Sequence, residues 1–188
     1  REASVADDRE HVNEICGLTA APVYVAVHAV NGDDIYRDAR ELARVSDQII
    51  VQVPLVEDAF GAMHRLHADG IRVAAMLVFN AAQALLAAKA GATTVVTPLD
   101  QLDAVGHSGG EVVRELRRVF DASHTECDIL AVRPTTAQQF SESALAGADG
   151  VAIAPDVLRS LLLHPLTDRG IDQFLNDVSR HRGGWNNQ

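Results

Sequence analysis

Three polar side chains stand within or just after short apolar runs, where they could act on a small molecule. His28 follows the run 23–27, Gln52 lies inside the run 49–53, and Arg133 follows the run 129–132. An imidazole exchanges protons near neutral pH, a side-chain amide orients a substrate by hydrogen bonds, and a guanidinium holds a carboxylate or phosphate by two parallel bonds. We therefore interpret His28, Gln52 and Arg133 as the candidate catalytic residues of an acid/base site for a small anion.

Each of these residues also has a purely structural interpretation. Arg133 could pair with a carboxylate such as Asp100 or Asp149, because a buried guanidinium without a partner is costly. His28 could fill the end of a strand, and Gln52 could bond to a neighbouring backbone group. Both interpretations stay open at the level of the sequence.

The elements that must position these residues alternate between strands and helices. Runs of β-branched and apolar residues predict strands at 23–29, 48–53, 72–79, 93–96, 129–132 and 150–153, and amphipathic stretches follow them. Strands joined by helices pair in parallel, and near-continuous apolar strands are typical of a sheet buried on both faces. A spacing of about one strand and helix per twenty-five residues predicts an α/β fold, a (β/α)8 TIM barrel, as a single domain over residues 1–188.

Alternation along the strands predicts which side chains face the barrel interior. The expected interior residues are Tyr24, Ala26, His28, Ile50, Gln52, Ala74, Met76 and Val78. Arg133 and Thr135 are expected at the C-terminal mouth, where barrel enzymes bind their substrates. An apolar interior with a few polar groups near the rim is typical of a small-molecule pocket. The candidate substrate-binding residues are Tyr24, Met76, Asn80, Thr97 and Thr135.

Composition narrows the class of partner. The formal net charge of −10 argues against nucleic acid, and the apolar runs are too short to cross a membrane. No glycine-rich phosphate-binding motif occurs, and His64 and His67 lack a third ligand nearby, so we expect neither a cofactor nor a metal. Cys16 and Cys127 are expected to be reduced thiols of a cytoplasmic protein.

Three segments carry a resemblance to a known family. They are the run Ile49-Ile50-Val51-Gln52-Val53-Pro54, the run from Leu77 to Ala92 and the run from His164 to Leu175. Together they resemble the transaldolase family, specifically its short branch that includes fructose-6-phosphate aldolase. The resemblance implies a barrel of the transaldolase type, with a Schiff-base lysine on the strand that here carries Gln52. An amide nitrogen is not a nucleophile, so the family reaction cannot start at this position.

Other positions that the resemblance associates with chemistry also differ. The residues found there are Ala26 for a glutamate or glutamine, Ala74 and Met76 for an asparagine and a threonine, Gln101 for an arginine, and Arg133 and Thr135 for a serine and a basic residue on the phosphate-holding strand. Lys89 is the only lysine, and it lies near the end of a predicted helix, where its charge favours solvent.

These differences lead to two hypotheses. In the first, the protein has lost Schiff-base aldolase chemistry and binds or converts a small anionic metabolite, as a repurposed lyase, isomerase or cyclase. In the second, it is a catalytically silent member that acts through binding or assembly. Residual transaldolase or aldolase activity is a third, weaker alternative.

The resemblance also implies a preceding segment and an assembly. The match begins with a helix expected at 6–16, which corresponds to the second helix of the barrel, so the first two strands are expected to be absent from the given chain. The C-terminal helix expected at 170–180 resembles one that packs on a neighbouring subunit in ring-forming members of the short branch. We therefore expect a homo-oligomer.

Overall fold

The computed structural model describes the backbone of residues 5–185 and the side chains of residues 9–180. The strands are β1 Val23–Ala26, β2 Ile49–Pro54, β3 Val73–Met76, β4 Thr94–Pro98, β5 Asp128–Val132 and β6 Gly150–Ala152. The helices are α1 Val5–Leu18, α2 Gly32–Ala43, α3 Ala59–Ala68, α4 Ala81–Lys89, α5 Leu99–Ala104, α6 Gly109–Ala122, α7 Ala137–Ala146, α8 Pro155–Ser160 and α9 Pro165–Trp185. All the strands predicted from the sequence are confirmed.

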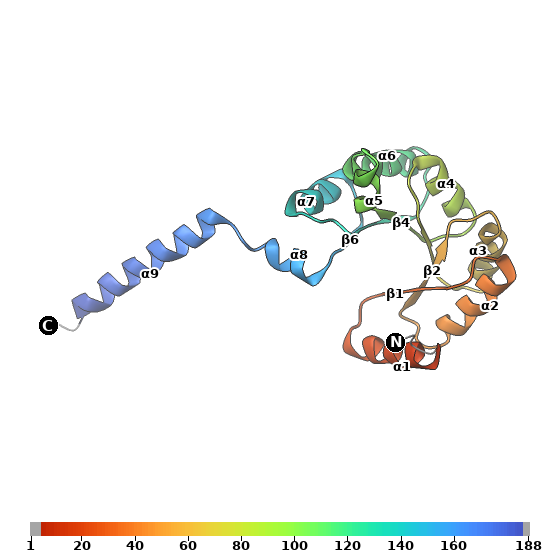
Figure 1. The fold of residues 1–188 in the computed structure, drawn as a ribbon, viewed down its shortest axis with the longest axis horizontal. Helices are drawn as coiled ribbons and strands as arrows, with labels where there is room; N and C mark the ends of the chain where they lie inside the picture. The colour runs from red at the N-terminus through yellow and green to blue at the C-terminus, as the bar shows by residue number, and fades with distance from the viewer. Residues whose placement is uncertain (1–4, 186–188) are drawn as a thin grey trace.

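The strands form one parallel sheet in the order β1-β2-β3-β4-β5-β6. The sheet is curled, and helices α2 to α7 lie around its outer side (Figure 1). This arrangement is an α/β half-barrel, which confirms the predicted parallel α/β fold. Because the described strands β1 and β6 each pair with only one neighbour, the half-barrel has two open edges.

The two faces of the sheet bury different side chains. The outer core joins strand residues such as Val51 and Ile129 to helix residues such as Met63 and Phe120. The inner cluster, on the concave face, consists of Ile50, Ala74, Val96 and Leu130 with Tyr24, Met76 and Val132 packed against them. Strict alternation in β2 explains this division, since Ile50 faces inward while Val51 and Val53 face the helices.

Side-chain caps fix where several helices begin. Asn31 and Ser108, the N-caps of α2 and α6, accept hydrogen bonds from the backbone N–H of Asp34 and Glu111, respectively. The expected start of the last helix at residue 170 is wrong, because α9 already begins at Pro165. The fixed φ of proline suits the first turn of a helix, which explains the earlier start.

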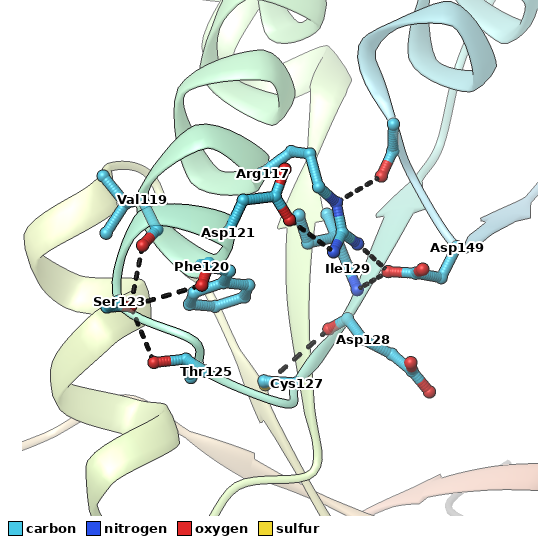
Figure 2. A network of polar contacts seen from close by, with 11 residues as sticks. Arg117, Val119, Phe120, Asp121, Ser123, Thr125, Cys127, Asp128, Ile129 and Asp149 are labelled. Carbon is cyan, nitrogen blue, oxygen red and sulfur yellow. Dashed lines mark hydrogen bonds and ion pairs between the residues drawn. The ribbon is translucent and has the colours of Figure 1, made fainter.

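A polar network fixes the beginning of β5 against α6 and α7 (Figure 2). Arg117 on α6 donates from Nε to the carbonyl of Gly147 at 3.1 Å and forms an ion pair with Asp149. The Asp149 carboxylate also accepts from the backbone N–H of Ile129 at 2.7 Å. Gly147 has φ +97°, and a Cβ there would lie 2.9 Å from Cγ of Arg117. This close approach requires glycine at the end of α7.

Helices α8 and α9 extend away from the half-barrel (Figure 1). The residues Ile171, Phe174 and Leu175 on α9 are 51%, 65% and 57% exposed. These residues fall on one face of the helix, because they are three and four positions apart. No helix in the described part of the chain is both long and apolar enough to cross a membrane.

Candidate functional site

The candidate residues lie toward the edge of the sheet where the strands end. Gln52 is half-buried near the end of β2, in register with Ala26 on β1 and Ala74 on β3. Because Gln52 is two residues after Ile50, its side chain shares the concave face with the inner cluster. His28 is exposed and lies two residues beyond the end of β1. Within the described residues, no hydrogen bond or ion pair joins His28 to Gln52 or Arg133.

Two of the candidate substrate-binding residues lie on the concave face, as expected. Tyr24 and Met76 are half-buried and pack against the inner cluster. The orientation predicted for Val78 is wrong: it is fully buried in the outer core. The reason is local, since β3 ends at Met76 and Leu77 adopts φ +65°, which interrupts the alternation of side chains.

The other candidate substrate-binding residues occupy different environments. Thr97 is fully buried, and alternation along β4 places it on the helix-facing side with Val95. Its hydroxyl has no hydrogen-bond partner in the described part of the chain. Asn80 caps α4 by accepting from the N–H of Gln83 at 2.9 Å. It also lines a cavity of about 540 Å³ with Phe79, Gln101, Leu102, Val105 and His107.

Arg133 follows the last residue of β5 directly and has φ +59°, a conformation that residues with a side chain rarely adopt. Its Nε lies 3.0 Å from Oδ1 of Asp100 in the first turn of α5. The Arg133 side chain is 53% exposed and that of Asp100 is 34% exposed. Of the two carboxylates expected as possible partners, Asp100 is confirmed, whereas Asp149 pairs with Arg117.

Comparison with known proteins places this geometry in a family. The family model for transaldolase/fructose-6-phosphate aldolase matches residues 6–186. The chain belongs to this family. A probable transaldolase of Bartonella tribocorum is 42% identical over 168 residues, which cover 89% of this chain and 77% of that protein. One of Hyphomonas neptunium is 41% identical over 171 residues, with 91% and 79% coverage. One of Bacillus cereus is 37% identical over 171 residues, with 91% and 80% coverage.

The only lysine of this transaldolase-family chain lies away from the concave face. Lys89 is exposed in the last turn of α4, as expected. The chain passes from there to the beginning of β4, so Lys89 lies toward the edge where the strands begin. The concave face of the described half-barrel therefore carries no lysine.

Gln139, beside the Arg133 loop, is not among the site residues predicted from the sequence. Thr135 donates to Oε1 of Gln139 from its backbone N–H at 2.6 Å and from its hydroxyl at 3.0 Å. Gln139 in turn donates from Nε2 to the carboxylate of Asp103 on α5. Thr136 and Gln139 have the spacing of a capping box, which indicates that Gln139 folds back toward the helix start, although its bonds are to Thr135 rather than to the cap residue itself.

In the described residues, no group of three or more histidine, cysteine or acidic side chains is placed to hold a metal ion. Among the candidate residues, the C-terminal edge carries the guanidinium of Arg133, the amide of Gln52 and the imidazole of His28.

Proposed function

We propose that this transaldolase-family protein binds a small anionic metabolite at the C-terminal edge of its sheet and does not form a Schiff base with it. The observation that carries the proposal is the position of Lys89, the only lysine, which is exposed on α4. A lysine becomes nucleophilic when a pocket removes its amine from water, and Lys89 lies in no such pocket but at an exposed helix end. In this proposal Gln52 stands where the family carries its lysine, and its amide cannot replace that amine.

Arg133 supports the anionic character of the ligand. Its Nε is paired with Asp100, and about half of the side chain is open to solvent. The nitrogens beyond Nε can therefore donate to a phosphate or carboxylate. Arg133 also follows the strand that the resemblance associates with phosphate. In this proposal Gln52 orients the ligand, and His28 exchanges protons with it if the ligand is converted.

Two measurements test this proposal. Borohydride treatment with dihydroxyacetone or fructose 6-phosphate is expected to leave the mass of the protein unchanged. A substrate-dependent adduct, on Lys89 or elsewhere, would contradict it and favour residual aldolase activity. Calorimetry with a panel of sugar phosphates and carboxylates is expected to show binding that Arg133→Ala weakens about tenfold, as for the loss of one charge-assisted contact.

A matched variant controls for the loss of one positive charge. Arg159 on α8 pairs with Asp156 at 2.9 Å, and its side chain is 77% exposed. Arg159→Ala changes the net charge by the same amount as Arg133→Ala. Because Arg159 lies on α8 and not at the proposed site, its loss should leave ligand affinity unchanged. Equal weakening by both variants would indicate a general effect of charge and would remove Arg133 from the site.

The second candidate function is assembly by a catalytically silent protein, and the apolar face of α9 favours it. Ile171, Phe174 and Leu175 remain more than half exposed on a helix that extends from the half-barrel. We propose that this face packs on a second copy of the chain, since apolar side chains gain stability when removed from water. Light scattering should show a native oligomer that Phe174→Glu disrupts and Gln173→Glu, the adjacent charge change, does not. A monomeric native protein would contradict this assembly.

We infer a complete (β/α)8 barrel in which two further strands pair with the open edges of β1 and β6, because open edges of a parallel sheet expose unpaired backbone groups. A structure of the assembled protein with these edges unpaired would contradict the complete barrel.

We also propose a cytoplasmic location. Cys16 and Cys127 are both free thiols, which supports it. Microscopy of the tagged protein in cells would test that location.

A further inference from the structure

Two loops at the C-terminal edge repeat the same backbone geometry. In both, the strand is followed at once by a residue with positive φ, Leu77 after β3 and Arg133 after β5. Three residues later comes the N-cap of the next helix, Asn80 for α4 and Thr136 for α7. Residues with a side chain adopt such φ values only where surrounding contacts hold them, so both loops need an anchor.

The anchor is a glutamine at the same position in each helix. Oε1 of Gln83 accepts from the backbone N–H of Phe79 at 2.8 Å. Oε1 of Gln139 accepts from the backbone N–H of Thr135 at 2.6 Å, and also from the Thr135 hydroxyl. Each glutamine therefore fastens the residue before the helix cap to the first turn of its own helix.

The two glutamines differ in the hydrogen bond made by the side-chain nitrogen Nε2. Nε2 of Gln139 donates to Oδ2 of Asp103 on α5, whose Oδ1 accepts from the backbone N–H of Gly109 at 3.3 Å. In the part of the chain that the structure describes, Gln83 makes no comparable bond to a third element. Gln139 alone thus ties its loop to a separate helix.

Helix α5 contacts Arg133 directly through one residue and Gln139 of α7, which holds the Arg133 loop, through another. Asp100, which pairs with Arg133, and Asp103, which accepts from Gln139, are three residues apart and therefore neighbours on the helix surface. The first contact holds the guanidinium, and the second holds the loop that carries it. The cavity of about 270 Å³ between α5, α6 and α7 is lined by Asp103 and Gln139 as well.

We propose that Gln139 is a positioning residue for the anion site. It fixes the loop after β5 against α5, so that Arg133 is held beside Asp100 with its remaining nitrogens directed to a ligand. The inference rests on the proposed function, in which Arg133 contacts the anion. Gln139 does not touch the ligand and acts through the loop.

The inference can be tested by exchanging the side-chain amide of Gln139 with the carboxylate of Asp103. Gln139→Glu keeps an acceptor for Thr135 but sets a second carboxylate against Asp103. In the double variant Gln139→Glu with Asp103→Asn, the introduced asparagine oxygen accepts from Gly109, and its amide donates to the introduced glutamate. The double variant therefore restores every bond and has the same net charge as the native protein. Gln83→Glu is the control, because it makes the same charge change in the repeated loop.

Calorimetry with inorganic phosphate measures the effect on binding. Gln139→Glu should weaken phosphate binding about tenfold, as expected when a charge-assisted bond that positions the guanidinium is lost. The double variant should bind within about threefold of the native protein, and Gln83→Glu should do the same. Thermal melting of each variant identifies loss of fold as a separate cause. Weak binding by a well-folded double variant, or no effect of Gln139→Glu, would overturn the inference.

The NMR signal of the Arg133 Nε–H group, assigned by its loss in Arg133→Lys, separates this inference from the proposed function. It reports the contact with Asp100 in the absence of any ligand. Gln139→Glu should shift this signal and the double variant should return it. If native protein does not bind phosphate or the other anions, the proposed function fails, and the signal alone then decides whether Gln139 positions Arg133. An unchanged signal in Gln139→Glu would rule that out.

Discussion

Two arginines near opposite ends of β5 show how differently the two edges of the sheet use the same side chain. At the start of the strand, Arg117 is 27% exposed and all of its guanidinium nitrogens have partners, which are Gly147, Asp149 and Asp121. After the end of the strand, Arg133 is 53% exposed, and among the described residues its one partner is Asp100. The guanidinium of Arg117 finds its hydrogen-bond and ion-pair partners within the fold, whereas that of Arg133 keeps donors for a ligand.

This difference matches a division of roles known for barrels. Contacts at the edge where strands begin serve stability, and groups at the edge where strands end face the substrate. The comparison predicts that changes at the Arg117 network alter stability, and that changes near Arg133 alter binding.

The largest expected effect is that of Arg117→Ala. It removes the contacts with Gly147 and Asp149 and leaves the half-exposed Asp149 carboxylate with only the Ile129 N–H. We expect the free energy of unfolding to fall by about 2–3 kcal/mol, less than for a fully buried pair. Urea denaturation measures it. Arg133→Ala serves as the comparison and should cost less than about 1 kcal/mol, because its ion pair is exposed. Equal losses would remove the distinction between the two edges.

Gly147→Ala should have the next largest effect. It places a Cβ 2.9 Å from Cγ of Arg117 at a residue with φ +97°. Strain and displacement of the arginine should together cost about 1–2 kcal/mol in urea denaturation. Gly61→Ala is the matched control, since it lies in α3 and a Cβ there meets nothing within 4 Å. That control should raise stability by about 0.5–1 kcal/mol, because alanine favours a helix.

A smaller effect concerns the thiol of Cys127 at the start of β5. Burial, with the nearby charges of Asp128 and Asp149, raises its pKa from 9.0 to about 12. Between these values the unfolded chain binds fewer protons than the folded protein, so this contribution to stability is present below pH 9 and is lost as pH rises toward 12. Unfolding measured in urea at about pH 8 and about pH 10 should show a loss of about 1 kcal/mol that Cys127→Ala abolishes. Cys16→Ala should retain the loss.

The sequence predicted the parallel α/β sheet well because its signal is periodic and local. Apolar runs located each described strand, and alternation placed Tyr24, Met76 and Gln52 on the concave face. It failed for Val78, since nothing in the residue types indicates that Leu77 adopts a positive φ. Leucine is rare in that conformation, and the surrounding fold imposes it.

The candidate site was predicted only in part for a related reason. Asp100 could be named as a partner of Arg133, because each follows a predicted strand and parallel strand ends lie together. The bond from Gln139 to Asp103 joins residues 36 positions apart in the chain. Its formation depends on how α5 and α7 are oriented, which residue pattern does not encode. The resemblance, in turn, named positions such as Gln52 but not what they contact.

The smallest expected effect tests whether the guanidinium of Arg133 keeps hydrogen-bond donors available to a ligand. Asp100→Asn removes the negative charge beside the guanidinium, while the introduced amide oxygen can still accept from Nε of Arg133. Because the native pair is exposed, stability should change by less than about 0.5 kcal/mol. Phosphate binding should strengthen about threefold, since the anion no longer competes with a carboxylate for the same cation. Calorimetry at low and high salt measures this gain in affinity, which salt should reduce.

The control for this prediction is Asp156→Asn, beside Arg159 on α8. It removes an equal charge elsewhere and should leave the affinity for phosphate unchanged. Weaker binding in Asp100→Asn would mean that the ion pair itself forms the site, and Arg133 would then resemble Arg117 more closely than the exposure of its side chain indicates.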